Sequence, residues 1–289
     1  MAAETMIQAR GLSIGYSRPL MEGLDFSIAR GEVFLVLGGS GTGKSTLLKT
    51  LFGRLRPLAG SVEIAGVGDP AHLQGRRPQF GVSFQGGALF GSMTIAQNVA
   101  LPLEQWTDLD GPTIAGIVEG KLRLVGLDGA GDKLPSELSG GMQKRAGIAR
   151  ALALENDLLF LDEPSAGLDP ITSSELDDLL IALNRSLGLT LVIVTHELES
   201  IYRIGTRAIL LDKVTRGIIA DGDPRDLRAR SLDPRVEAFF HRQSQSTRGR
   251  TQAQEEVKAS GPADEPFVAP PMPLPKRRKF EDPFKDEYL

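Results

Sequence analysis

VFLVLGGSGTGKST, residues 33–46, carries the strongest fold signal in the chain. Its first five residues form a continuous apolar run, which is typical of a β-strand covered on both faces. Gly38 to Ser45 match the pattern G-x-x-x-x-G-K-[ST], and a helical stretch follows to Phe52. A strand, a glycine-rich loop and a helix in this order predict a P-loop, whose backbone N–H groups surround a phosphate.

The loop residues have separate expected roles. We expect Lys44 to reach the β- and γ-phosphates and to take part in catalysis, and the Ser45 hydroxyl to ligate Mg²⁺. A chance match to this pattern is on the order of one in a hundred for such a chain, which makes an accidental glycine-rich turn a weak alternative. The predicted nucleotide-binding residues are Gly38, Gly39, Ser40, Gly41, Thr42, Gly43, Lys44, Ser45 and Thr46.

A second apolar run, LLFL at residues 158–161 of the segment LLFLDEP, is followed directly by Asp162 and Glu163. A solvated strand end is the alternative, but the buried run places the pair at the carboxyl edge of a sheet, where ligands bind in α/β folds. We therefore predict that Asp162 holds magnesium, through water, and that Glu163 is the base that deprotonates the attacking water.

Composition limits the class of protein. The chain has 289 residues of which 41% are hydrophobic, enough for one large domain or two modest ones. It contains no cysteine, which excludes disulfides and cysteine-based zinc sites. The net charge of -4 argues against a nucleic-acid partner. The start of the chain lacks the pattern of a signal peptide, and no apolar run is long enough to span a bilayer.

The chain alternates between strand and helix patterns. Residues 24–28 alternate as in an antiparallel sheet, and 191–194 form another buried run. Leucines at helical spacing from Leu176 to Leu187 predict a helix between the parallel strands. Residues from about Ile95 to Leu138 are helical with no strand, and Asp233-Pro234 begins the last predicted helix. From residue 244 to 289 the chain is proline-rich and poor in aliphatic residues, which predicts a disordered tail.

LSGGM, residues 138–142, precedes another helical pattern and offers a second phosphate site at a helix N-terminus. By itself Ser139 could equally be an ordinary helix N-cap, with Gly140 and Gly141 in a loop. The order of this motif and the other motifs along the chain favours the phosphate site. Lys44, Gln85, LSGGM, LLFLDEP, Asp169 and His196 together resemble the ATP-binding subunits of ATP-binding cassette (ABC) transporters, over residues 5–243.

This resemblance implies an α/β fold: a P-loop NTPase (RecA-like) nucleotide-binding domain with an antiparallel β subdomain and an inserted helical subdomain at about 95–150. It also implies an ATPase with ATP and Mg²⁺ as cofactors. In this family two copies pair head to tail, so that Ser139, Gly140 and Gly141 of one copy would bind the nucleotide held by the other P-loop. ATP then joins the two chains, and hydrolysis releases them.

Further roles carry over by position. Gln85 resembles the glutamine that senses magnesium and water, although a lone glutamine after a strand is usually a surface group. Asp169 looks like the aspartate that communicates across the dimer, although Asp-Pro is also a common turn. His196 resembles the histidine that contacts the γ-phosphate. Tyr16 stands where family members stack an aromatic ring on adenine, with a packing tyrosine as the alternative.

Residues 80–103, Met142 and DPRVEAFF at 233–240 are similar to cassettes of lipid transporters linked to MCE proteins, including the Mla type. This similarity implies phospholipid transport through membrane permease subunits and an MCE-domain partner, with the chain on the cytoplasmic face of the inner membrane. Another solute, such as an amino acid, and a regulatory nucleotide-binding module without turnover remain the alternatives. A basic cluster, Lys276 to Lys279, with nearby aromatic residues makes the tail either a docking segment or simply solvated chain.

Overall fold

The computed structural model describes residues 4–73 and 76–240, all within one compact unit that runs from Met1 to Thr247. The predicted disordered tail, residues 244–289, lies outside the described residues. The strands are β1 (Thr5–Gly15), β2 (Pro19–Ala29), β3 (Val33–Gly38), β4 (Ala59–Ile64), β5 (Gly81–Ser83), β6 (Leu158–Asp162), β7 (Thr190–Val194), β8 (Arg207–Asp212) and β9 (Gly217–Gly222).

The helices lie mostly between these strands, as in an α/β fold. They are α1 (Lys44–Leu51), α2 (Ile95–Trp106), α3 (Gly111–Leu124), α4 (Gly140–Ala151), α5 (Pro170–Leu187), α6 (Leu198–Ile204) and α7 (Pro224–Arg230), with the short 3₁₀ helices η1 (Pro70–His72) and η2 (Pro135–Glu137). Residues 234–240 are also helical, as predicted from Asp233-Pro234. No helix in the described part of the chain has both the length and the apolar character that a membrane crossing requires.

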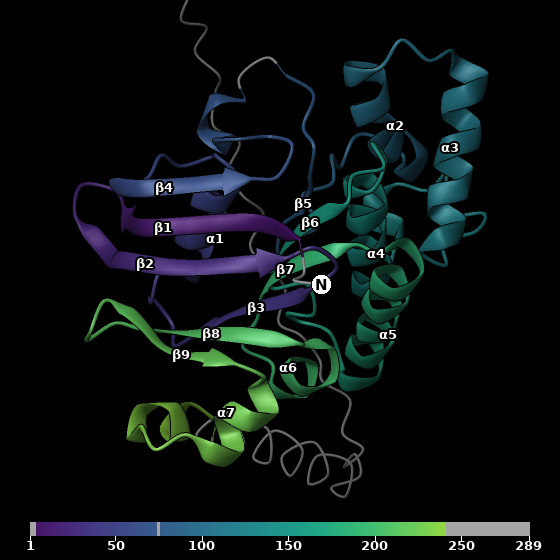
Figure 1. Cartoon of the computed structure of the whole chain (residues 1–289). Coiled ribbons are helices and arrows are strands. Elements are labelled where there is room, and N and C mark those ends of the chain that lie inside the picture. Colours follow the sequence, from purple (N-terminus) through teal and green to yellow (C-terminus); the bar gives the residue numbers. More distant parts are fainter. Residues whose placement is uncertain (1–3, 74–75, 241–289) are drawn as a thin grey trace, which may run out of the picture. The chain divides into compact units, whose positions relative to one another are not determined.

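The strands form two sheets (Figure 1). A three-stranded antiparallel sheet has the order β2-β1-β4. A six-stranded sheet has the order β5-β6-β7-β3-β8-β9, in which only β9 runs antiparallel to its neighbour. Since the carboxyl ends of parallel strands share one edge, the loops after β3, β6 and β7 meet there.

Strand β3 divides the core because its side chains alternate between the two faces of the large sheet. Phe34 and Val36 pack with the antiparallel sheet and with Leu47 of α1. Val33 and Leu35 pack on the opposite face with α2, α4, α5 and α6. All six residues of β3 are buried. Coverage on both faces is the reason that this strand appears in the sequence as an unbroken apolar run.

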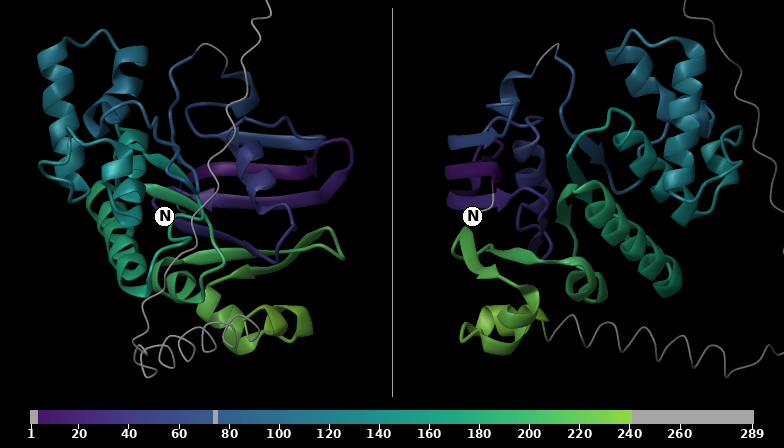
Figure 2. Two further views of the ribbon diagram at one scale, coloured as in Figure 1. Left: turned by 180° about the vertical axis from the view of Figure 1, so that it is seen from behind. Right: turned by 45° about the vertical axis from the view of Figure 1, so that its right-hand side comes forward.

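A helical region separates β5 from β6. Residues 84–157 contain α2, α3, η2 and α4 and no strand. Thr94 begins α2 with a capping box, in which its hydroxyl accepts from the Gln97 N–H and Gln97 accepts from the Thr94 N–H. Figures 1 and 2 place α2 and α3 on the opposite side of the large sheet from the antiparallel sheet.

The fold class is confirmed, including both sheets and the helical insert. The apolar runs at 33–37, 158–161 and 191–194 are strands of the parallel part of the large sheet, and 24–28 lies in antiparallel β2. In α5, Leu176, Leu180 and Leu183 are buried. Leu187 is 48% exposed because it is the last helical residue, next to the left-handed Gly188. The domain boundaries at 5, 95, 150 and 243 stay predictions.

Candidate functional site

The glycine-rich loop joins β3 to α1 at the carboxyl edge of the large sheet. Gly38, Gly41 and Gly43 have φ angles of 153°, 74° and 89°, a region that favours glycine. A Cβ on Gly38 would lie 2.6 Å from Thr42 Oγ1 and 2.9 Å from Leu211 O, so the loop has no room for a larger residue there. The sequence therefore folds into this loop only with glycine at these positions.

Helix α1 begins at Lys44 directly after the loop. Its N-cap is Gly43, which supplies no side-chain hydrogen bond, and its first turn has no acidic residue. The amide groups at this end and the positive end of the helix dipole therefore suit an anion such as a phosphate. Lys44 Nζ donates to the carbonyl oxygens of Gly38 and Gly39 at 3.0 and 3.1 Å, which holds a positive charge at the loop.

The loop and the end of β6 meet at one hydrogen bond. Ser45 Oγ donates to Asp162 Oδ1 at 3.2 Å, across 117 residues of sequence. Burial raises the pKa of the Asp162 carboxyl, and the bond from Ser45 and the neighbouring lysines oppose this rise. Burial also lowers the pKa of the Lys44 ammonium, against the charges of Glu163 and Asp162. A hydroxyl and a carboxylate at this distance form a pair of hard oxygen donors that fits Mg²⁺.

Glu163 and His196 lie together at the same edge of the sheet. Glu163 is a non-glycine residue with φ of +51°, and its N–H donates to Val194 O at 2.8 Å. Glu163 Oε2 is buried and lies 2.6 Å from His196 Nδ1, close enough for an ion pair when the imidazole is protonated. A carboxylate in this position suits a base that accepts a proton from a ligand or from water.

Ser139 and Asp169 both cap helices. Ser139 Oγ accepts from the Met142 N–H at 3.3 Å at the start of α4. Asp169 accepts from the N–H groups of Ile171 and Thr172 at the start of α5, and these bonds together with that of the Thr172 hydroxyl lower the pKa of its carboxyl. No hydrogen bond of the described residues joins Ser139 to the glycine-rich loop. Ser139 therefore has the ordinary N-cap role, and its role toward a nucleotide stays a prediction.

Tyr16 and Gln85 are exposed. Tyr16 is 63% exposed, which favours the stacking role over packing. Gln85 lies in the turn after β5, with its side chain exposed. Its backbone carbonyl accepts a hydrogen bond from Nζ of Lys144 on α4. The sequence analysis did not predict this contact of Lys144. The only signal in the sequence is that Lys144 lies two residues after the LSGGM motif.

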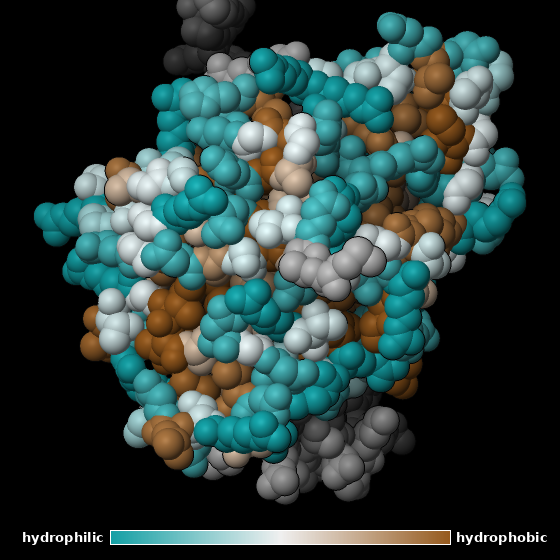
Figure 3. All heavy atoms as spheres, in the orientation of Figure 1, coloured by the Kyte–Doolittle hydropathy of each residue, from teal (hydrophilic) through white to brown (hydrophobic). Residues whose placement is uncertain are grey.

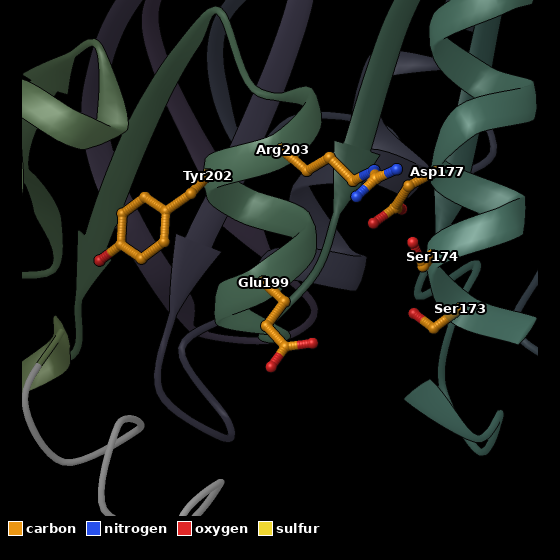
Figure 4. Close-up of a pocket in the computed structure, with 6 residues that line it drawn as sticks. All are labelled: Ser173, Ser174, Asp177, Glu199, Tyr202 and Arg203. Atoms are coloured by element: carbon orange, nitrogen blue, oxygen red, sulfur yellow. The ribbon is translucent and has the colours of Figure 1, made fainter. Parts of the chain in front are cut away.

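Other hollows lie away from the glycine-rich loop, and the two described next do not suit a phosphate. One of about 390 Å³ is between α5 and α6. Figure 4 shows Arg203 extending from α6 toward Asp177 on α5, and its guanidinium already pairs with Asp178 at 2.5 Å. The hydrophobic surface over α2 and α3 in Figure 3 includes a groove of about 630 Å³ with acidic residues such as Glu119 and Asp132. Carboxylates there would repel an anion.

The chain is similar to proteins of known class. Residues 21–166 match the family model described as ABC transporter. The "Intermembrane phospholipid transport system ATP-binding protein MlaF" of Escherichia coli K12 is 41% identical over 229 residues, which cover 78% of this chain and 84% of that protein. The "Probable ribonucleotide transport ATP-binding protein mkl" of Mycobacterium leprae is 41% identical over 241 residues, which cover 81% of this chain and 68% of that protein.

A solved structure is similar in fold. It is the dimeric post-hydrolysis state of the ATP-binding cassette MJ0796 bound to ADP and Pi. The two structures match with a TM-score of 0.68 and 28% sequence identity, and the match covers 75% of this chain and 98% of the MJ0796 chain.

Proposed function

This chain belongs to the ABC transporter family as an ATP-binding subunit with ATPase activity, and from that premise we propose that it energises phospholipid transport by a membrane complex. The identity to the E. coli phospholipid transport protein supports this cargo. The equally identical mycobacterial relative, named for ribonucleotide transport, makes ribonucleotides the second candidate cargo. Both proposals use the same ATPase, so the cargo depends on the subunits that surround it.

One observation carries the assignment of chemical roles: the Ser45 hydroxyl and the Asp162 carboxyl meet at 3.2 Å, with Glu163 next in sequence. In our proposal residues 38–46 bind the phosphates of ATP. Ser45, Asp162 and Gln85 hold Mg²⁺, which neutralises phosphate charge during hydrolysis. Glu163 accepts the proton of the attacking water, His196 contacts the γ-phosphate, and Tyr16 stacks on adenine.

The proposed working unit is a head-to-tail dimer of this chain. The similar cassette MJ0796 is described as dimeric with bound ADP and Pi. In this chain Ser139 caps α4 and forms no hydrogen bond with its own glycine-rich loop, and we propose that it binds the nucleotide held by the second copy. Gly140 and Gly141 begin α4 beside it, and Asp169 caps α5. ATP would then bridge the two copies, and hydrolysis would weaken the bridge.

An apolar groove of about 420 Å³ beside the Gln85 turn supports a membrane partner. Its lining includes Phe84 and Phe90, which are 38% and 51% exposed, and Trp106. Exposed aromatic surface of this kind favours a protein interface. We propose that permease subunits dock here, that an MCE-type protein completes the complex, and that the chain sits on the cytoplasmic face of the inner membrane.

Glu163→Gln tests the proposed chemistry in the complex purified from membranes. The amide keeps the shape of the side chain but cannot accept the proton, so hydrolysis should slow by roughly a hundredfold or more while ATP still binds. Glu197→Gln is the matched control, because Glu197 lies 3.7 Å from the other ring nitrogen of His196. Near-normal hydrolysis by the Glu163 variant, or an equal loss in both variants, would remove Glu163 as the base.

The cargo is tested on the same preparation. Lipids extracted from the purified complex should contain phospholipid, and addition of phospholipid vesicles should stimulate ATP hydrolysis by the wild-type chain. Stimulation by ribonucleotide cargo, with no bound phospholipid, would favour the second candidate.

A further inference from the structure

The turn of residues 84–88, after β5, lies directly against α4. Gly87 and Ala88 both have positive φ angles, of 71° and 49°. A Cβ added to Gly147 of α4 would lie 3.1 Å from Gly87 O, and one added to Gly87 would lie 3.2 Å from Gln143 O. The helix and the turn therefore approach closely, and a side chain at either position would push its neighbour away by a few tenths of an ångström. At Gly87 the positive φ angle also favours glycine.

Two cations of α4 bind the carbonyl groups of this turn. Lys144 Nζ donates to Gln85 O. Arg150 donates to Ala88 O at 2.8 Å and to Gly87 O at 3.0 Å. The turn that presents Gln85 is thus attached to the helix that Ser139 begins. Hydrogen bonds from charged donors are stronger than those from neutral ones, so the attachment is firm.

Lys144 also reaches the backbone of the proposed base. Its Nζ donates to Glu163 O at 3.3 Å, while the Glu163 N–H donates to Val194 O at 2.8 Å. Both backbone polar groups of Glu163 are therefore held: the N–H by β7, and the carbonyl by the Ala166 N–H at 3.2 Å as well as by Lys144 of α4. Such bonds explain how a non-glycine residue keeps the left-handed conformation that aims its side chain.

The position of Lys144 is unusual for a lysine. The residue is only 8% exposed, although lysine is almost never buried without partners. Burial lowers the pKa of its ammonium, and the charges of Glu163 and Asp162 oppose that shift. The carbonyls of Gln85 and Glu163 supply the partners that make burial possible.

We propose that Lys144 is a positioning residue for hydrolysis, because one ammonium group fixes the backbone of Glu163 relative to that of Gln85 and ties both to α4. This inference rests on the proposed function. In this proposal Lys144 keeps the backbones of Glu163 and Gln85 at a fixed separation. A movement of α4 would then shift both residues together. Lys144 acts through these two residues and need not touch the nucleotide.

Lys144→Met tests this role, because it keeps the length of the side chain and removes the three donors. Lys144→Arg keeps donors and charge. The matched control is Lys121→Met in α3, where the lysine is 15% exposed and pairs with Glu155 at 3.2 Å, away from both carbonyls. Glu163→Gln serves as the reference for loss of the base.

The first measurement is amide hydrogen exchange on the full chain without nucleotide. The Gly87 N–H, which donates to Phe84 O at 2.8 Å, should exchange about tenfold faster in Lys144→Met, in keeping with loss of a charged hydrogen bond. Lys121→Met should leave that exchange unchanged, and Lys144→Arg should restore most of the protection. A merely space-filling lysine would give no difference between Met and Arg at this position.

The second measurement is ATP hydrolysis by the membrane complex. Lys144→Met should lower kcat by about tenfold or more while KM and ATP affinity stay near wild type, and Lys144→Arg should recover the rate. Wild-type kcat in Lys144→Met, or failure of the Arg variant to recover, would overturn the inference. So would parallel losses of kcat, affinity and melting temperature. Wild-type ATP hydrolysis by both Glu163→Gln and Lys144→Met would contradict the proposed function. Wild-type hydrolysis by Lys144→Met alone would contradict only the role proposed for Lys144.

Discussion

Replacing Asp177 by Asn should stabilise the chain at neutral pH and flatten the pH dependence of its stability. Asp177 is 2% exposed in α5, and burial raises the pKa of its carboxyl from 3.8 to about 6. A pKa raised on folding means that ionisation favours the unfolded chain. The contribution of protonated Asp177 to the free energy of unfolding is therefore fully present below pH 3.8 and is lost as the pH rises through about 6.

The size of the effect follows from the same values. At about 1.4 kcal/mol per pKa unit, the ionised carboxyl costs at most roughly 3 kcal/mol. Asp177 lines the hollow between α5 and α6, so water screens part of its charge. We therefore expect Asp177→Asn to raise the free energy of unfolding by about 1–2 kcal/mol at pH 8 and to leave it nearly unchanged at pH 4.

Urea unfolding of the full chain at pH 4, 5, 6, 7 and 8 measures this difference, provided that the slope of free energy against urea stays constant. Asp178→Asn is the control, because the adjacent Asp178 is exposed and pairs with Arg203 at 2.5 Å. That variant should lose up to about 1 kcal/mol at pH 8, the opposite sign. A destabilised Asp177→Asn at pH 8, or a gain that does not change with pH, would refute the reasoning.

Two further predictions concern ATP binding, measured by equilibrium dialysis with the full chain. Lys44→Ala should weaken ATP binding by about tenfold or more, since it removes the charge that Gly38 O and Gly39 O hold at the loop; unchanged affinity would remove Lys44 from the phosphate site. Tyr16→Ala should weaken binding by about two- to tenfold, the usual range for one aromatic contact, whereas Tyr16→Phe should not. Because Tyr16 is 63% exposed, neither change should lower the melting temperature, and a clear drop would point to packing instead of stacking.

Several predictions from the sequence depended on local pattern alone. The run at 33–37 is β3, and the predicted glycine-rich loop follows it, with positive φ angles at Gly38, Gly41 and Gly43. Asp162 and Glu163 end β6 as predicted, and the contact of Ser45 with Asp162 brings the two motifs together. Gln85 follows the short strand β5, Gly81–Ser83, whose three residues carry too little periodicity for the sequence to predict its bounds.

The local order of residues therefore determined which segments become buried strands, where the glycine-rich loop lies, and which side chains stand at the ends of strands. These features depend on neighbours a few residues apart, so they are visible in a linear pattern. Only the tertiary structure decided that Glu163 lies beside His196, that Tyr16 is exposed, and that Lys144 joins Gln85 to Glu163. Glu163 and His196 meet because β6 pairs with β7, and Lys144 reaches Gln85 and Glu163 because α4 packs beside both residues. These residues are far apart in the sequence, so no local pattern records that they are close in space.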